Sequence, residues 1–408
     1  MDHGSRMTRR RFLALGGLAA AGWGLAPGWI RAAAAASRGA KKVLVVLFQR
    51  GAADWLNIVP PYADPAYRLA RPTIRIPEPG RPAGALDLDG RFGLHPALAP
   101  LLPLWKERRF AVVQATGSPD PTRSHFDAQD YMESGTPGLK ATPDGWLNRA
   151  LAAGAAPREP LAAVAIAGRT PRTMEGPFPV MAVSSADQLR GVGAEAESFE
   201  SIYIEAADSL LSGPARELAA ARKAVAGLPA AGARAAEDAG YPKCRLGRDF
   251  FELARLIKAD VGLRVGFLDS AGWDHHFDEG ATQGLLARRL AELGSAVAAF
   301  YKDLGAASED VLLVTMTEFG RALEENGNVG TDHGHGSAMA VFGPVKGGRV
   351  YGDWPGLGDG ALFESRDLAV TTDYRRVLAE LLRGHLDAAD LSGVFPGAAA
   401  SGAPLGLL

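Results

Sequence analysis

The sequence predicts an α/β fold, a three-layer α/β/α sandwich built on a mostly parallel central sheet. Two observations support this prediction. Short runs of Val, Leu, Ile and Ala are typical of strands that are buried on both faces, and segments with helical periodicity separate them. Strands that alternate with helices favour a parallel sheet covered on both faces. The length of 408 residues exceeds that of most single domains but still fits one large α/β domain.

Six apolar runs are the expected strands, and the first of them reads KKVLVVLF. They cover residues 41–48, 110–115, 161–167, 264–268, 311–315 and 338–342. The expected helices cover residues 95–108, 126–133, 145–153, 199–225, 247–258, 283–304 and 373–386. We interpret the helix-rich stretch 187–259 as a helical cap inserted over one end of the sheet. A single domain is therefore predicted over residues 41–395.

The first 36 residues have the pattern of an export signal. Arg9 and Arg10 precede an apolar run over residues 13–29, and small residues follow at 33–36, as in a cleavable signal peptide. The paired arginines resemble a twin-arginine signal, a route that exports folded proteins. An uncleaved membrane anchor is the alternative, but Gly, Trp and Pro interrupt the run, and about 20 apolar residues are needed for a span. We expect cleavage, the twin-arginine export machinery as a partner, a periplasmic or secreted location and no stable membrane anchor.

The composition gives no indication of nucleic-acid binding and excludes structures that need several cysteines. The net charge is −2 and no long basic run occurs, so nothing indicates nucleic-acid binding. Cys244 is the single cysteine, which excludes an internal disulfide framework and a thiolate metal cluster.

Polar residues gather directly after the expected strands, and five of the eight histidines are among them. In open parallel sheets, ligands bind beyond the carboxyl ends of the strands. The residues in these positions are Asp54, Ser124, His125, Asp274, His275, His276, Glu318, Arg321, His333 and His335.

Carboxylates and imidazoles without thiolates suit Zn²⁺ or Mn²⁺ better than Mg²⁺. In an extended segment, residues i and i+2 point the same way, so Asp274 and His276 should converge while His275 points elsewhere. The same rule makes His333 and His335 share a pocket in GTDHGHGS. Two groups of ligands suggest one or two ions, which lie about 3.5–4 Å apart in two-metal hydrolases. The expected metal ligands are Asp54, Asp274, His276, Glu318, His333 and His335.

Each residue also has a plainer interpretation. Asp54 fits a turn or cap residue, Glu318 fits a cap for the following helix, and Ser124 fits a helix N-cap. His275 and His276 could be surface residues. Their shared position at the strand ends is what favours a metal site.

Several long motifs resemble the signature blocks of the exported bacterial family DUF1501. The matching segments are RGAADWLN, RSHFDAQDYMESG, GWDHHFDEG, TEFGRALEENGNVGTDHGHGS and GPVKGGRVYGDWPGL, and the resemblance covers nearly all of residues 41–386. The family is grouped with the alkaline phosphatase and sulfatase superfamily, whose members hold two metals at the strand ends. Those enzymes attack a phosphate or sulfate ester with a Ser, Thr or modified Cys at a helix N-terminus. The resemblance thus implies an exported metal-dependent hydrolase with an alkaline phosphatase-like fold and an anionic ester as its substrate.

The resemblance also implies roles for individual residues. Asp54 is similar to the carboxylate that binds the metal on the nucleophile side, and Asp274 with His276 to the pair that binds the other metal. Ser124 stands where the nucleophile opens its helix, and Arg321 would clamp a non-bridging ester oxygen. If Ser124 is only a helix cap, a metal-bound hydroxide would attack directly and no covalent intermediate would form.

The chain departs from the family pattern in two places. Glu318 takes the place of an Asp, and Phe319 stands where the superfamily has the metal-binding His. His333 and His335 would then supply the missing imidazoles. Ala52 replaces a usual glycine in the first block.

Two residues beside these motifs have expected roles of their own. His125 follows Ser124, where the superfamily has no histidine, and is itself a candidate ligand. Asp332 is expected to point away from the metal and to orient a ligand histidine or a neighbouring backbone group.

Two other functions are the alternatives to a hydrolase. One is a non-catalytic exported binding protein in which the metal fixes the loops. The other is an exported oxidoreductase, which is disfavoured because QRGAADW, after the first expected strand, lacks the G-x-G-x-x-G spacing of a dinucleotide site.

Overall fold

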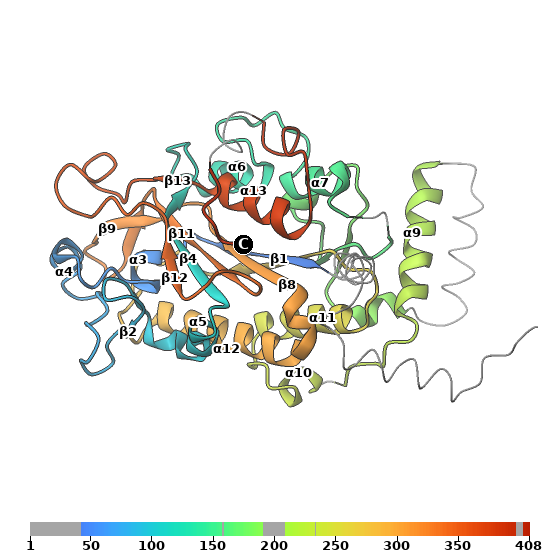
Figure 1. Cartoon of the computed structure of the whole chain (residues 1–408), viewed down its shortest axis with the longest axis horizontal. Helices are drawn as coiled ribbons and strands as arrows, with labels where there is room; N and C mark the ends of the chain where they lie inside the picture. Colours follow the sequence, from blue (N-terminus) through green and yellow to red (C-terminus); the bar gives the residue numbers. More distant parts are fainter. Residues whose placement is uncertain (1–41, 157–158, 191–208, 233, 397–402) are drawn as a thin grey trace, which may run out of the picture. The chain divides into compact units, whose positions relative to one another are not determined.

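A sheet of nine strands lies at the centre of the structure, a computed structural model (Figure 1). In order across the sheet come β12 (Arg349–Tyr351), β4 (Phe110–Gly117), β11 (Ser337–Phe342), β8 (Val311–Met316), β1 (Val43–Arg50), β7 (Val265–Ala271), β5 (Ala163–Ile166) and β6 (Met181–Val183). The ninth strand, β13 (Thr372–Asp373), pairs with β4. β11 runs antiparallel to β4 and β8, and all other pairings in the sheet are parallel. The predicted α/β class with a mostly parallel sheet is confirmed.

The structure describes residues 42–408 except 157–158, 191–208, 233 and 397–402. Residues 42–408 cluster as one unit. The expected export signal over residues 1–36 lies outside the described residues. Within the described part of the chain, no helix is long and apolar enough to cross a membrane.

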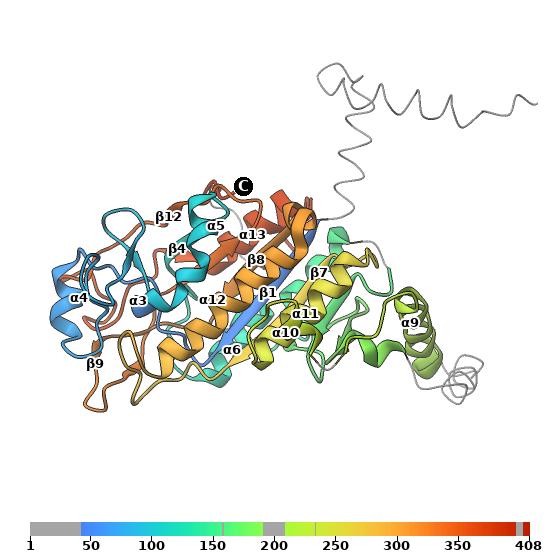
Figure 2. The same cartoon turned by 90° about the horizontal axis from the view of Figure 1, so that it is seen from below.

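Helices cover both faces of the sheet, because the strands bury alternate side chains in opposite directions. In β1, Val43, Val45 and Leu47 pack toward α11 (Arg245–Lys258) and α12 (Leu285–Leu304). The intervening side chains of β1 pack toward α7 (Trp146–Ala150) and α13 (Tyr374–His385). Figure 1 shows α6 (His125–Ser134), α7 and α13 above the strands. It shows α5 (Leu102–Lys106), α11 and α12 below them, and Figure 2 shows this second layer from its outer side.

The remaining elements are short or lie at the edges of these layers. The helices are α3 (Trp55–Ile58), α4 (Pro65–Ala70), α5 (Leu102–Lys106), α6 (His125–Ser134), α9 (Ser209–Val225) and α10 (Ala235–Asp238). Two small hairpins pair β2 (Leu86–Asp87) with β3 (Gly93–Leu94) and β9 (Arg321–Glu325) with β10 (Thr331–His333). The sequence patterns did not indicate the β9–β10 hairpin.

The expected helical cap over residues 187–259 divides into two parts. Its last helix, α11, belongs to the layer that covers the sheet, because Leu246, Phe250 and Leu253 are buried in the same core as α12. The described part before α11 carries α9 and α10, and Ala221 and Val225 of α9 are buried against the same core.

Candidate metal centre

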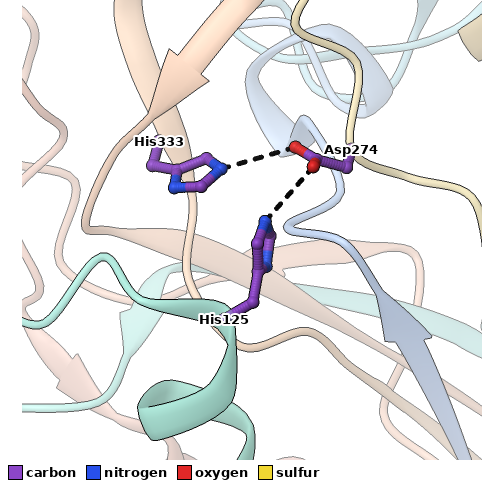
Figure 3. A group of neighbouring side chains, drawn as sticks. All are labelled: His125, Asp274 and His333. Carbon is purple, nitrogen blue, oxygen red and sulfur yellow. Dashed lines mark ion pairs between the residues drawn. The ribbon is translucent and has the colours of Figure 1, made fainter.

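Three histidines and one aspartate bring their side-chain ends together, as Figure 3 shows for three of them. The Nε2 atoms of His125 and His333 each lie 3.4 Å from a carboxylate oxygen of Asp274. The Nε2 atom of His276 lies 3.1 Å from Asp274 Oδ1 and 2.8 Å from Nε2 of His333. One ligand atom from each of His125, Asp274 and His333 can be chosen so that all lie within 4.8 Å of one another. These four residues are called the His₃Asp cluster below.

The cluster forms where several strands of the sheet end. His125 is the first residue of α6, which follows β4, while Asp274 and His276 lie in the loop after β7. His333 ends β10 in the hairpin that follows β8. This edge of an open α/β sheet is where ligands bind.

The other nitrogen of each imidazole faces an oxygen that accepts a hydrogen bond. Nδ1 of His333 lies 2.8 Å from the carbonyl oxygen of Arg123, and Nδ1 of His125 lies 2.8 Å from Glu318 Oε1. Nδ1 of His276 lies 3.3 Å from Asp332 Oδ1. A carbonyl and an ionised carboxylate only accept, so each Nδ1 carries the proton. In the neutral imidazoles, Nε2 therefore carries a lone pair, and all three lone pairs belong to atoms of the cluster.

This donor set fits a divalent cation. The Nε2 atoms of His276 and His333 are 2.8 Å apart, and two lone pairs facing each other at that distance repel unless a proton or a cation lies between them. A tetrahedral site with bonds of about 2.0–2.1 Å has edges of about 3.4 Å. The four separations given above, three that involve Asp274 and the one between His276 and His333, are 2.8–3.4 Å and so close to that value. Metal-binding histidines also commonly donate their other N–H to a carboxylate or a carbonyl, as these do.

The pKa shifts keep the acidic groups of the site ionised. Burial works to raise the pKa of Glu318, but hydrogen bonds from His125 and Gln129 outweigh it and lower that pKa. Burial likewise works to raise the pKa of Asp274, and the hydrogen bond and positive charge of Arg321 lower it. The hydrogen bond to Glu318 raises the pKa of His125, whereas burial lowers that of His333.

Close backbone approaches hold the His333 hairpin against its neighbours. A Cβ at Gly334 would lie 2.3 Å from the carbonyl carbon of Arg321, and one at Gly330 would lie 2.4 Å from that of His276. Asn326, in the turn of the hairpin, donates from Nδ2 to the carbonyl oxygen of His276. Gly330 is therefore needed to dock the hairpin on the loop that carries His276, and Gly334 is needed where the chain after β10 passes close to β9.

The family model described as "Protein of unknown function (DUF1501)" matches residues 109–393. The chain belongs to the DUF1501 family. All four residues of the His₃Asp cluster lie within the matched segment. A comparison with curated proteins finds no match to this chain.

Among solved structures, this DUF1501 protein is similar to the C-terminal periplasmic domain of EcEptC from Escherichia coli, in complex with Zn. The TM-score is 0.35 and the sequence identity is 10%, over 74% of this chain and 73% of that chain.

Glu318 is not a member of the His₃Asp cluster, but it contacts His125, which is one. Its Oε1 accepts hydrogen bonds from His125 Nδ1, Gln129 Nε2 and the backbone N–H of Gly51, each at 2.8 Å. The carboxylate expected as a ligand thus orients His125, which is itself a candidate ligand. Asp332 does the same for His276, as the sequence led us to expect.

Arg321 does not reach a substrate. Its side chain is fully buried, and Nη2 donates to Asp274 Oδ1 at 2.6 Å. The other hydrogen bonds of its guanidinium go to the carbonyl oxygens of Gly51, Ala52, Trp273 and Thr331. The expected role as an ester clamp therefore does not fit, and Arg321 instead positions Asp274 and joins three loops.

Asp54 lies apart from the cluster. It is 1% exposed, and its two oxygens accept from Nη1 and Nη2 of the buried Arg71 at 2.5 and 3.1 Å. Both oxygens are engaged, so the structure does not present Asp54 as a ligand.

His335 also lies apart from His333. The chain bends at His335 between β10 and β11, so the shared face expected from the i, i+2 rule is lost. The His335 ring is buried and packs against Phe363 with a centroid distance of 4.3 Å. The prediction that both imidazoles enter one pocket is wrong.

Phe319 and Ala52 stand at the two departures from the family pattern, and their packing shows what each residue does there. The Phe319 ring packs against the rings of His125 and His333, with centroids 5.0 and 4.9 Å apart, and so supports two ligands without being one. Ala52 has φ of +56°, in the left-handed region that glycine favours, and its side chain is buried with Phe319 and Ala128.

His125 was not among the expected ligands, although its position beside Ser124 had made it a candidate, and the structure places it in the His₃Asp cluster. The available signal was its place at the start of a helix after a strand. Ser124 itself is the exposed N-cap residue of α6, and its side chain makes no capping hydrogen bond.

Proposed function

We propose that this DUF1501 protein is an exported metal-dependent hydrolase of the alkaline phosphatase and sulfatase superfamily that acts on a phosphate or sulfate ester. The observation that supports this most directly is the His₃Asp cluster, in which three imidazole lone pairs converge on Asp274 at the catalytic edge of the sheet.

His125, Asp274, His276 and His333 would hold the ion, which we propose to be one zinc or manganese ion. When bound, such an ion polarises ester oxygens and lowers the pKa of an adjoining hydroxyl group or water molecule. With Asp274 as the one charged ligand, the ligand shell leaves a divalent ion with a net positive charge, which favours an anionic ester. Asp274 and His276 are 44% and 36% exposed at their side chains, so the cluster is accessible from solvent.

Ser124 is the proposed nucleophile. It adjoins the ligand His125, it is exposed, and its hydroxyl group is not used to cap α6. The first N–H groups of α6 have no partner within the helix and would face an anionic ester at this position. In this reaction a bond forms between Ser124 Oγ and the phosphorus or sulfur atom, the bond from that atom to the alcohol oxygen breaks, and the leaving alcohol takes up the proton that the Ser124 hydroxyl group loses. A water molecule would then displace Ser124 from its ester, which releases phosphate or sulfate and restores the hydroxyl group.

One observation favours a second candidate, a non-catalytic exported metal-binding protein. Four protein ligands complete a tetrahedral zinc site, whereas catalytic zinc sites keep one position for water or substrate. A hydrolase would therefore need a five-coordinate ion or the release of one ligand during turnover.

Export through the twin-arginine machinery is part of the proposal. Arg9→Lys with Arg10→Lys should keep the full-length precursor in the cytoplasm, while the wild-type chain should appear in a shortened form in the periplasm. Periplasmic processing of the double variant would exclude this route.

The test of the proposed function combines metal analysis with turnover. Protein purified without chelator should contain about one equivalent of zinc or manganese. It should hydrolyse at least one of p-nitrophenyl phosphate, bis-p-nitrophenyl phosphate and p-nitrophenyl sulfate. Asp274→Asn should lose both properties, and Ser124→Ala should lose turnover but keep the metal. Full metal content without turnover of any ester would support the binding protein instead.

A further inference from the structure

A cavity of about 700 Å³ lies beside the His₃Asp cluster, over the carboxyl ends of β1, β5 and β7. Its lining includes Arg50, Gln129, Arg169, Arg172 and Arg245. This volume is within the range that small-molecule sites occupy. None of the residues that line the cavity has a role in the metal site proposed above, apart from Gln129.

Helix α6 connects the cavity to the cluster. His125, Gln129 and Glu133 are spaced four residues apart and so lie along one side of the helix. His125 faces Asp274, Gln129 donates to Glu318, and Glu133 binds Arg50 inside the cavity. At 1.5 Å per residue, Gln129 and Glu133 lie about 6 and 12 Å along the helix from His125. A molecule bound at both places would therefore span a distance on the order of 10 Å along α6.

Most charges in the lining are already paired. Arg50 contacts Glu133 and Asp269 at 2.9 and 2.7 Å. Arg172 lies 3.8 Å from Glu175, which also lines the cavity, and 2.9 Å from Asp130, which does not. The three carboxylates that line the cavity, Glu133, Glu175 and Asp269, are thus all within ion-pair distance of Arg50 or Arg172.

Two guanidinium groups of the lining remain available for a ligand. Arg169 is exposed and makes no hydrogen bond or ion pair with any described residue. Arg245 is 67% exposed, and the one ion pair that it forms with a described residue, to Asp249, is loose at 3.4 Å. Arginine binds carboxylate, phosphate and sulfate groups through paired N–H donors.

We propose that the cavity binds the alcohol part of the substrate and that this part carries a second anionic group, which Arg169 and Arg245 recognise. The substrate is then an ester with two anionic groups on the order of 10 Å apart, one at the cluster and one in the cavity. This inference rests on the proposed function, because the cluster supplies the first anionic site.

Two benzylphosphonates that differ only in the charge of the remote group test the inference, because their carbon–phosphorus bond is not hydrolysed as an ester. The probes are 4-carboxybenzylphosphonate and its neutral counterpart 4-carbamoylbenzylphosphonate, and the readout is the dissociation constant from calorimetry on the zinc-loaded full chain. The wild-type protein should bind the carboxylate probe about 10- to 100-fold more tightly, the range for hydrogen bonds to charged groups. The double variant Arg169→Gln/Arg245→Gln should bind both probes equally, at the level of the neutral one.

Arg349→Gln is the matched control, because Arg349 is exposed on β12, next to β4 and away from the β5 side of the sheet. This variant should keep the full preference for the carboxylate probe. Equal binding of the two probes by the wild-type protein, or a preference that survives in the double variant, would overturn the inference.

The ratio of the two dissociation constants distinguishes a failure of this inference from a failure of the proposed function. A preference that depends on Arg169 and Arg245 in a protein that hydrolyses no ester would support the cavity site and exclude the hydrolase. Ester hydrolysis by a protein without the preference would support the hydrolase and exclude the anionic site in the cavity.

Discussion

Two charged clusters lie beyond the strand ends of this protein, and they are built in opposite ways. In the His₃Asp cluster the side chains are partly exposed, and the three Nε2 lone pairs meet with no donor between them. In the second cluster Asp54, Arg71 and Glu279 are almost fully buried, and Arg71 donates to both oxygens of Asp54. The remaining donors of Arg71 reach the carbonyl oxygens of Ala322 and Leu323.

The buried cluster also contains a carboxyl group with a raised pKa, that of Glu279. Glu279 Oε2 accepts from Thr331 Oγ1, and Oε1 has no donor among the described residues. Burial and the negative charge of Asp54 raise the pKa of Glu279 well above its usual value, while the pKa of Asp54 is lowered, because Arg71 and a hydrogen bond from Glu279 outweigh the effect of burial. The raised pKa of Glu279 favours its protonated form, in which the carboxyl group can donate a hydrogen bond. The two clusters differ in that Arg71 occupies both oxygens of Asp54, whereas the described residues provide no such donor for the Nε2 atoms of the His₃Asp cluster.

The largest expected effect is on stability, from breaking the buried cluster. Arg71→Met leaves Asp54 without its ion-pair partner inside the protein and should lower the free energy of unfolding by about 3–5 kcal/mol. Arg68→Met is the matched control, since the pair of Arg68 with Glu78 is exposed and should contribute less than about 1 kcal/mol. Urea unfolding measures both. Similar losses of unfolding free energy in the two variants would mean that the buried ion pair contributes no more to stability than the exposed one.

The next effect is on metal affinity, from removing one ligand. His333→Ala should weaken zinc binding by more than about 100-fold, which exceeds the usual effect of residues that only orient a ligand. Its stability without metal should change little because the side chain is partly exposed. His335→Ala, two residues along the chain, should keep the affinity. Equilibrium dialysis with zinc measures both variants, and loss of zinc from His335→Ala would return His335 to the ligand set.

A smaller effect is expected from the residue that orients His276. Asp332→Asn should weaken zinc binding by about 10–100-fold, because the amide no longer fixes the proton on Nδ1 as an ionised carboxylate does. Asp278→Asn is the control, since Asp278 is an exposed acid two residues after His276. An unchanged affinity in Asp332→Asn would mean that the 3.3 Å contact does not position the ligand.

The smallest effect concerns pH. Glu279 has a raised folded-state pKa, so its contribution to stability is fully present below its usual pKa of 4.5 and is lost as the pH rises through the folded-state value. The loss is at most about 1.4 kcal/mol per pH unit. Glu279→Gln should remove this decline from the unfolding free energy measured above pH 4.5, and the exposed Glu309→Gln should leave it. A Glu279→Gln protein with the same decline as the wild type would show that the buried pair holds no proton.

Much of the fold could be predicted from local patterns. The six expected strands are all strands of the sheet, because fully buried strands are continuously apolar, and this signal is local to each segment. Three short strands of the sheet, β6, β12 and β13, and the β2–β3 and β9–β10 hairpins were missed. All of these strands except β9 have only two or three residues, which carry too little pattern. The expected helix over residues 95–108 forms as a 3₁₀ helix over Pro96–Leu101 followed by α5.

The sequence by itself determined that carboxylates and imidazoles would gather at the carboxyl ends of the strands, because the position of a residue relative to its strand is a local property. It also determined that Asp274 and His276 converge, since both belong to one extended segment. Only the tertiary structure decided which groups stay available as ligands. Asp54 meets Arg71 across 17 residues of chain, and His125 meets Glu318 across 193, so that one carboxylate is neutralised and one imidazole is oriented. Lone pairs and their donors are matched by contacts between distant segments, and no spacing within a single segment contains that information.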